Sequence, residues 1–260
     1  MKITIITATY NCATTIGDTI ESVLQQTHTD VEYIIVDGNS TDSTPQIVEH
    51  YRPQFAGRLV YIREADKGIY DAMNKGIRRA TGDVVGLLNA DDFFTSADVL
   101  ERVAATLESQ PQTDAVYGDV HYVVPTDLTR SVRYYSSRPF RRSWMRLGFM
   151  PAHPSFYCRR SVYERYGLFD TSYRVAADFE LLLRFIFVHR IRTTYIPRDF
   201  VTMRTGGAST SGLSSHRQIM ADHRRALRTN GVRSAYALLA LRYVYKAGEV
   251  LAGKVSRRKR

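Results

Sequence analysis

Three polar clusters along the chain contain residue types that bind nucleotides and metals, at residues 7–11, 37–42 and 89–92. The third reads Asn89-Ala90-Asp91-Asp92. Two adjacent carboxylates repel each other unless a cation or hydrogen-bond donors offset their charge. Mn²⁺ or Mg²⁺, held by one or two carboxylates and by substrate phosphates, is such a cation. The pair therefore predicts a metal site at Asp91 and Asp92; the alternative is that both carboxylates only cap the next turn.

The elements that must position these clusters alternate between β-branched runs and segments of helical period, which is typical of a wound α/β sheet. Strands are expected at residues 3–7, 31–36, 59–63, 84–88, 115–124, 155–158 and 195–203. Helices are expected at residues 16–27, from 44 onward, and at 69–80, 99–107, 162–166 and 178–188. Residues 125–152, rich in arginine, serine and aromatic side chains, predict an irregular or inserted segment. Since ligands of open α/β sheets bind outside the carboxyl ends of the strands, we expect the three clusters to share one pocket.

The composition is that of an ordinary globular protein, because 44% of the 260 residues are apolar and 24% are charged. This balance excludes a disordered, collagen-like or coiled-coil chain. Cys12 and Cys158 lie outside any Cys/His cluster, which fits a reduced compartment. The first residues enter a strand rather than a signal sequence, and no run reaches about 18 apolar residues, so we expect a cytosolic protein. No GxGxxG motif follows the first strand, which argues against dinucleotide binding.

The positive charge is concentrated at the end of the chain. Residues 217–260 contain 12 Lys and Arg against Asp222 and Glu249, so they carry the whole net charge of +10. Residues 209–260 predict a basic, amphipathic helical tail that lies on an anionic membrane surface. A solvated tail without a partner is the alternative. Nucleic-acid binding is a further alternative, but it leaves the three polar clusters unexplained and is not expected.

Several motifs in their order along the chain resemble family 2 glycosyltransferases of the GT-A fold. The motifs are Thr-Ala-Thr-Tyr-Asn at 7–11, Val-Asp-Gly-Asn-Ser-Thr-Asp-Ser-Thr at 36–44, Asp-Lys-Gly-Ile-Tyr-Asp-Ala-Met-Asn-Lys-Gly at 66–76, Leu-Asn-Ala-Asp-Asp at 88–92, His-Pro-Ser-Phe-Tyr at 153–157 and Asp-Phe-Glu at 178–180. The resemblance spans roughly residues 1–207 and is greatest to bacterial enzymes that build surface polysaccharides or glycolipids. It implies a mixed, mostly parallel sheet flanked by helices.

The resemblance also implies a pocket for a nucleotide diphosphate sugar of UDP, dTDP or GDP type. Ala8 and Tyr10 would line the base, and Asp37 would accept a hydrogen bond from a ring N–H. Asp91 matches the last acidic residue of the family's DxD motif, whose first position is Asn89 here. The full set of implied donor-binding residues is Thr7, Ala8, Tyr10, Asp37, Asp66, Lys67, Asn89, Ala90 and Asp91.

For the transfer step, the resemblance assigns the catalytic base to Asp178. Inverting transfer needs a carboxylate that takes the proton of the acceptor hydroxyl as its oxygen attacks the anomeric carbon. His153 would lie beside the acceptor or the diphosphate, and Arg204 would close over the donor phosphates. The alternatives are a helix cap for Asp178, a packed turn for His153 and a plain linker after Arg204.

The sequence therefore predicts an inverting hexosyltransferase that acts on a lipid-linked or saccharide acceptor at the inner face of the cell membrane. Its catalytic domain is expected at residues 1–208, with a donor half at 1–124 and an acceptor half at 125–208. A sugar nucleotidyltransferase and an inactive sugar-nucleotide binder are the other interpretations, since both need a nucleotide pocket.

Overall fold

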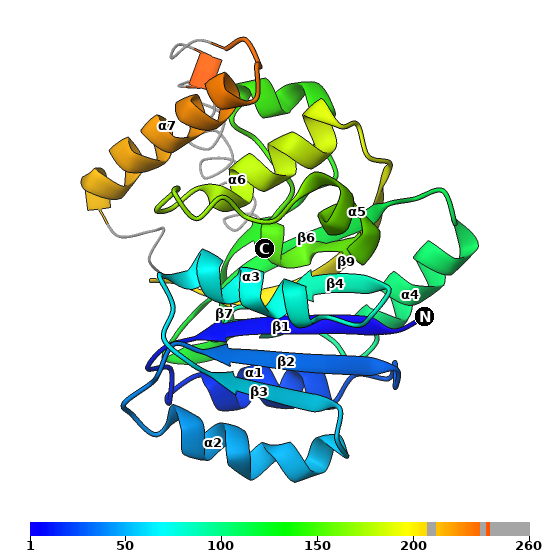
Figure 1. The fold of residues 1–260 in the computed structure, drawn as a ribbon, viewed down its shortest axis with the longest axis vertical. Coiled ribbons are helices and arrows are strands. Elements are labelled where there is room, and N and C mark those ends of the chain that lie inside the picture. The colour runs from blue at the N-terminus through cyan, green and yellow to red at the C-terminus, as the bar shows by residue number, and fades with distance from the viewer. Residues whose placement is uncertain (207–211, 235–237, 240–260) are drawn as a thin grey trace, which may run out of the picture.

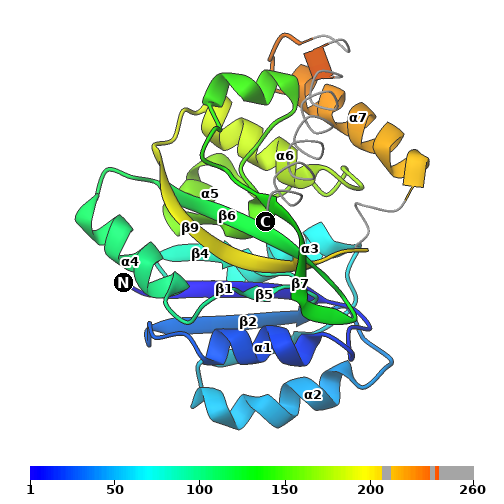
Figure 2. The ribbon, with the colours of Figure 1, turned by 180° about the vertical axis from the view of Figure 1, so that it is seen from behind.

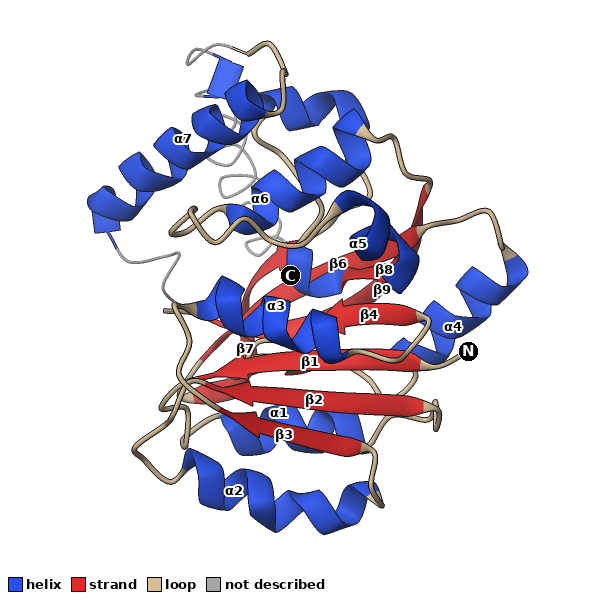
Figure 3. Cartoon of the chain, in the orientation of Figure 1, coloured by secondary structure: helices blue, strands red, loops and turns tan. Residues whose placement is uncertain are grey.

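The computed structural model describes residues 1–206, 212–234 and 238–239. Its first half is a parallel sheet of β1 (Ile3–Thr9), β2 (Val31–Asp37), β3 (Leu59–Arg63) and β4 (Val84–Leu87), in the order β3-β2-β1-β4. β1, β2 and β4 are buried along their whole length, because helices cover both faces of the sheet. Figure 3 shows these strands side by side. Their carboxyl ends therefore form one shared edge, as the sequence predicts.

The helices lie on opposite faces of this sheet. α3 (Ile69–Arg79) packs on one face (Figure 1), and α1 (Ile16–Leu24) and α2 (Thr44–Tyr51) lie on the other (Figure 2). A 3₁₀ turn at Arg52–Phe55 follows α2, and α4 (Val99–Ser109) follows the acidic loop. The side chains of β1 alternate accordingly. Ile6 packs with α3, whereas Ile3 and Ile5 pack with the apolar side chains of α1, α2 and α4.

The second half continues the same sheet with β5 (Phe93–Phe94), β6 (Ala115–Val124), β8 (Phe156–Arg159) and β9 (Thr193–Arg204). The order beyond β4 is β8-β6-β9-β5. β8 pairs antiparallel with β4 and β6, while the longest ladders, β1–β2 and β6–β9, are parallel. The predicted mixed, mostly parallel sheet flanked by helices is thus confirmed.

The expectation of an irregular segment at residues 125–152 is wrong for its first part. β7 (Asp127–Tyr135) forms an antiparallel hairpin with β6. Most of β7 is exposed, so its residues lack the apolar alternation that marks a half-buried strand. The rest of the segment contains two short 3₁₀ helices, Arg142–Leu147 and His153–Ser155.

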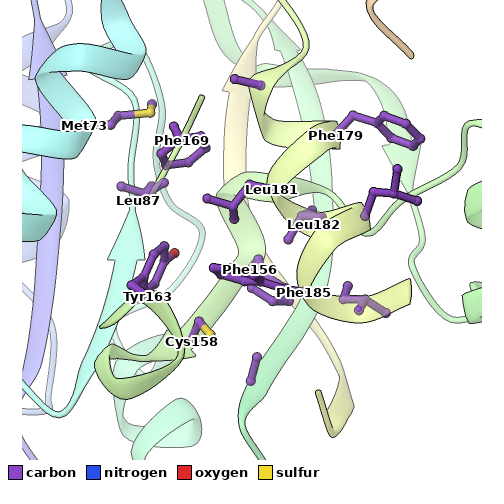
Figure 4. Packing of buried hydrophobic residues seen from close by; sticks show 14 of the residues in the cluster. Met73, Leu87, Phe156, Cys158, Tyr163, Phe169, Phe179, Leu181, Leu182 and Phe185 are labelled. Atoms are coloured by element: carbon purple, nitrogen blue, oxygen red, sulfur yellow. The ribbon is translucent and has the colours of Figure 1, made fainter. Parts of the chain in front are cut away.

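The remaining helices are α5 (Arg160–Tyr166), α6 (Ala177–Leu182) and α7 (Gly212–Thr229), the last of which lies in the predicted tail. The helix expected at 178–188 is α-helical only to Leu182 and continues as a π-helical turn, Leu183–Val188. Figure 4 shows Leu182 and Phe185 of this helix beside Phe156 of β8, and Phe179 of the same cluster further along α6. The same cluster includes Ala226 and Leu227 of α7, so this helix packs against α6.

The predicted tail at 209–260 is described only in part. α7 confirms helix in its first portion, and residues 240–260 lie outside the described residues. Within the described ranges, no helix is both long and apolar enough to cross a membrane. The division into a donor half, an acceptor half and a tail stays a prediction.

Candidate active site

The loops after β1 and β2 are braced against each other. Asn11 and Asn39 adopt left-handed φ angles of 53° and 63°, which asparagine tolerates better than most residues. The backbone N–H of Asn11 donates to Ser40 Oγ at 2.9 Å, and the N–H of Thr41 donates to Asn11 Oδ1 at 2.9 Å. The structure therefore brings the first two predicted clusters together at the carboxyl edge of the sheet.

Asp37 ends β2 and is fully buried beneath this edge. Its Oδ1 accepts the N–H of Ser40 at 2.7 Å, and its Oδ2 accepts the hydroxyl of Tyr61 at 2.5 Å. Burial, followed by the hydrogen bond to Asp37, raises the pKa of Tyr61 above its usual range. Asp37 thus fixes the second loop, and its predicted contact with a base N–H stays a prediction.

Tyr10, Gly38 and Asp66 lie together above Asp37. A Cβ at Gly38 would collide with the Asp66 carboxylate and would lie 3.5 Å from Tyr10 Cδ2. Tyr10 is 60% exposed, which leaves its ring available for stacking. The neighbouring Lys67 is exposed and its backbone N–H donates to Asp71 Oδ2 at 3.0 Å. These residues form the open part of the donor edge.

Two of the predicted donor residues lie lower in the sheet. Thr7 is buried in β1 and its Oγ1 accepts the hydroxyl of Tyr33 at 3.1 Å. Ala8 follows it and is 9% exposed. Direct contact of these two residues with a nucleotide stays a prediction.

The acidic loop places its two carboxylates differently. Asp92 is 1% exposed, and its Oδ2 accepts Nδ2 of Asn89 at 2.8 Å. Burial, followed by the charge of Asp91, raises the pKa of Asp92 to about 8. Ala90 between them is buried, whereas the Asp91 carboxylate is half-buried and makes no hydrogen bond or ion pair with the described residues. Of the two carboxylates in the acidic loop, Asp91 is therefore the one that makes no hydrogen bond with the described residues.

Arg204 lies beneath the acidic loop. Its guanidinium donates to the carbonyl of Asp91 at 2.5 Å, forms an ion pair with Asp18 of α1 and stacks over Phe93. The side chain of Arg204 is 7% exposed. Its predicted role as a phosphate-binding lid stays a prediction, since residues 207–211 lie outside the described residues. No motif in the sequence points to its partner Asp18.

In the acceptor half, Asp178 and His153 face each other. Asp178 lies in the first turn of α6, and His153 opens a 3₁₀ helix before β8. His153 Nδ1 lies 3.6 Å from Asp178 Oδ2, and about a fifth of each side chain is exposed. Burial raises the pKa of Asp178 and lowers that of His153. The pair thus combines a carboxylate of raised basicity with an imidazole that tends to be neutral.

The capping alternative for Asp178 accounts for only one of its oxygens. Oδ1 accepts the N–H of the adjacent Phe179 at 2.8 Å, which is a weak cap within the first turn. Oδ2 is the atom that faces His153. Tyr70 of α3 and Asp222 of α7 also interact electrostatically with Asp178. Sequence reasoning missed both, although Tyr70 belongs to the motif at 66–76.

A divalent cation fits the donor edge only with help from a substrate. Among the described residues, no three His, Cys, Asp or Glu side chains gather in a way that could hold a metal. The half-buried Asp91 offers one carboxylate, and phosphate oxygens are the usual remaining ligands of Mg²⁺. The free oxygens of Asp91 therefore fit a metal that arrives with a diphosphate.

Comparison with known proteins agrees with this arrangement. A family model described as Glycosyl transferase family 2 matches residues 4–167. A PGL/p-HBAD biosynthesis glycosyltransferase of Mycobacterium bovis (strain BCG / Pasteur 1173P2) is 35% identical over 180 residues, which cover 69% of this chain and 68% of that protein. An uncharacterized glycosyltransferase of Nostoc sp. is 37% identical over 123 residues, which cover 47% of this chain and 37% of that protein.

Two solved structures share the fold. The crystal structure of S. aureus TarS 1-349 in complex with UDP-GlcNAc has a TM-score of 0.68 at 19% identity and covers 92% of this chain and 71% of that chain. The mannosyltransferase PcManGT from Pyrobaculum calidifontis, in complex with GDP-Man and Mn²⁺, has a TM-score of 0.61 at 20% identity and covers 100% of this chain and 81% of that chain.

The curled α/β sheet with an acidic loop after β4 is that of a GT-A-type glycosyltransferase. The chain belongs to glycosyl transferase family 2.

Proposed function

We propose that the protein transfers a hexose, with inversion, from a nucleotide diphosphate sugar to a hydroxyl group of a lipid-linked or saccharide acceptor. The observation that carries this proposal is the half-buried Asp178 carboxylate of raised pKa that faces His153. A carboxylate that only served as a structural ion-pair partner would have its pKa lowered by a stable cation. A base is more effective when its pKa lies closer to the working pH.

In the proposed reaction, Asp178 takes the proton of the acceptor hydroxyl. The acceptor oxygen then forms a bond to the anomeric carbon while the bond from that carbon to the diphosphate oxygen breaks. The products are the inverted glycoside and a nucleoside diphosphate. The near-neutral His153 beside Asp178 leaves the carboxylate free to hold this proton, because a neutral imidazole does not compensate its charge.

On the donor side, Asp91 would hold Mn²⁺ or Mg²⁺ together with the diphosphate, and that cation offsets charge on the leaving group when bound. Asp92 is turned inward toward Asn89, so it would have to rotate to become a second ligand. Tyr10 and Asp66 would contact the base. The similar structures bind UDP-GlcNAc in TarS and GDP-Man with Mn²⁺ in PcManGT, which supports a donor of this class.

The donor proposal is tested by thermal unfolding with UDP, GDP, dTDP and CDP, each with and without Mn²⁺. A ligand that binds only the folded state raises the apparent stability. We expect a metal-dependent rise with one of the four. Release of a nucleoside diphosphate from the sugar nucleotide supports a glycosyltransferase, whereas release of pyrophosphate from a nucleoside triphosphate and a sugar phosphate, with formation of a sugar nucleotide, would indicate a nucleotidyltransferase. No rise with any nucleotide would contradict the donor proposal.

The acceptor and the location are also proposals. The Mycobacterium bovis relative is named for PGL/p-HBAD biosynthesis, which favours a lipid-linked acceptor near a membrane. Residues 240–260 hold seven Lys and Arg against Glu249, a charge that suits an anionic membrane at the cytoplasmic face. A chain that ends at residue 239 retains α7 and should sediment less with phosphatidylglycerol vesicles than the full chain. Equal sedimentation of both chains would contradict membrane attachment through this segment.

A further inference from the structure

Helix α6, which carries Asp178, begins without a capping side chain of its own. Its N-cap position is Ala176, which makes no side-chain hydrogen bond. The first N–H groups of a helix have no partner within the helix and normally bond a nearby polar side chain. Because the proposed base lies in this first turn, whatever holds the turn also sets the position of the base.

The hydroxyl of Tyr70 takes the place of the missing cap. It donates to the carbonyl of Val175, and its oxygen faces the backbone N–H groups of Ala177 and Asp178. Tyr70 comes from the first turn of α3, in the donor half of the sheet, and its ring stacks on Phe169 with centroids 5.5 Å apart. A single side chain thus holds the start of α6 from the opposite half of the molecule.

A second side chain holds the same residue from the other side. Asp222 of α7 is 4% exposed, and its Oδ2 accepts the backbone N–H of Val175 at 3.3 Å. Its Oδ1 accepts Nε2 of Gln218 at 2.8 Å. Both backbone polar groups of Val175 are therefore bonded by side chains from distant elements.

The neighbouring contacts strengthen this clamp. Asn74 lies one turn after Tyr70 and bonds both backbone groups of Phe169. Nδ2 of Asn74 donates to the carbonyl of Phe169 at 2.9 Å, and the N–H of Phe169 donates to Oδ1 of Asn74 at 2.9 Å. His223, next to Asp222, stacks on Phe179 with ring centroids 3.8 Å apart. The segment that leads to Asp178 is thus hydrogen-bonded to α3 at both Phe169 and Val175. The stacking of His223 on Phe179 in turn packs α7 against α6.

We propose that Tyr70 and Asp222 are positioning residues that clamp Val175 and so hold Asp178 in place for transfer. The proposal rests on the proposed role of Asp178 as the base. It assigns a function to the second part of the motif at 66–76, whose first part, Asp66 and Lys67, lies at the donor edge. It also makes α7 part of the catalytic unit.

Three variants test the clamp in the full chain. Tyr70→Phe removes only the hydroxyl and keeps the ring on Phe169, Asp222→Ala removes the acceptor, and Asp222→Asn keeps an oxygen that can accept the Val175 N–H. Tyr195→Phe is the matched control, since its hydroxyl also donates to a buried carboxylate, but that carboxylate is Asp119 of β6. Each variant is compared with the wild type in two measurements.

The first measurement is release of nucleoside diphosphate from UDP-GlcNAc and GDP-mannose. A misplaced base lowers kcat by about 10- to 100-fold in Tyr70→Phe and Asp222→Ala, while the KM for the donor changes less than about twofold. Asp222→Asn should recover most of the kcat that Asp222→Ala loses. Wild-type kcat in both Tyr70→Phe and Asp222→Ala would overturn the proposal, as would an equal loss in Tyr195→Phe.

The second measurement is hydrogen exchange of the peptides that cover residues 168–182. Exchange should become faster in Tyr70→Phe and Asp222→Ala and stay unchanged in Tyr195→Phe. Unchanged exchange in the first two variants would overturn the clamp, even if neither sugar nucleotide is turned over. A wild-type rate of nucleoside diphosphate release in Asp178→Asn would instead contradict the proposed base. The exchange data would still test the clamp, so failure of the clamp can be told apart from failure of the proposed base.

Discussion

The donor and acceptor halves hold their polar side chains by different means. In the predicted donor half, Asp37 ends β2 and Asn11 lies two residues after β1, and both bond residues of the adjoining loop or strand. In the acceptor half, Asp178 is faced by His153 from a 3₁₀ helix and is held through contacts from α3 and α7. The first arrangement joins neighbouring loops and strands at one edge of the sheet, whereas the second joins the start of α6 to two helices that are distant in the sequence. Substitutions should accordingly weaken nucleotide binding in the donor half and slow transfer in the acceptor half.

The largest expected effect on the rate comes from Asp178→Asn. The amide cannot take a proton from the acceptor hydroxyl, so the transfer rate constant should fall by about 10²- to 10⁴-fold. Binding of the nucleoside diphosphate should stay within about twofold of wild type, because Asp178 belongs to the acceptor half. Rates are measured with saturating sugar nucleotide, and binding by the thermal shift.

The same variant has a stability control. Burial raises the pKa of Asp178, so the folded state holds its proton more tightly than the unfolded state does, and the resulting stabilisation is lost as the pH rises through the raised value. An asparagine does not titrate, so Asp178→Asn does not lose this stabilisation. The Tm of the variant minus the Tm of the wild type should therefore increase, or stay constant, between pH 4 and pH 7. A clear drop in Tm at pH 7 would show that the slower transfer reflects misfolding.

A large effect on binding is expected from Asp91→Ala. Loss of the one free carboxylate of the acidic loop should remove the Mn²⁺-dependent part of the nucleotide thermal shift and lower turnover by about 100-fold or more. Asp92→Asn is the matched control, because an amide of the same shape replaces an inward-facing carboxyl and should retain most of the Mn²⁺ effect. If Asp92→Asn abolished the Mn²⁺ effect as fully as Asp91→Ala, both carboxylates would be ligands.

A smaller effect is expected from Tyr10→Ala. A base that stacks on an aromatic ring loses about 1–3 kcal/mol when the ring is removed. The affinity for the nucleoside diphosphate should therefore fall about tenfold, measured by titration calorimetry. Tyr10 is 60% exposed, so the Tm without ligand should stay the same. Unchanged affinity would place the base away from Tyr10 and Gly38.

The sequence predicts the donor half well because its signals are local. β1, β2, β3 and β4 are short β-branched runs, and each polar cluster begins within a residue or two of a strand end. The sequence patterns do not predict β7 or β5, for two different reasons. β7 is an exposed hairpin strand without apolar alternation, and β5 has only two residues, which is too short for any periodicity.

The acceptor side shows what local patterns leave out. Asp178 and His153 are found from their motifs, but their distance of 3.6 Å depends on how β8 and α6 pack. The bond from Arg204 to the Asp91 carbonyl and the clamp by Tyr70 both join residues more than 100 positions apart in the sequence. Such contacts are set by the tertiary structure, so motif spacing cannot supply them.

The smallest expected effect is a shift in the pH dependence of transfer. A base must be deprotonated to act, so the rate should fall as the pH drops through the raised pKa of Asp178, above the value of about 3.9 for an exposed aspartate. The charged or titratable side chains that face Asp178 are His153, Asp222 and Tyr70.

Substitutions of His153 and Asp222 should shift the acidic limb of the pH profile, which is the part where the rate falls at low pH, in opposite directions. A protonated His153 lowers the pKa of Asp178, so His153→Gln should move the limb to higher pH. The carboxylate of Asp222 raises the same pKa, so Asp222→Asn should move the limb to lower pH. Each shift should be less than about one pH unit, since both charges act on a group whose pKa is raised chiefly by burial. Profiles of kcat against pH measure both, and shifts in the same direction would mean that the limb belongs to a group other than Asp178.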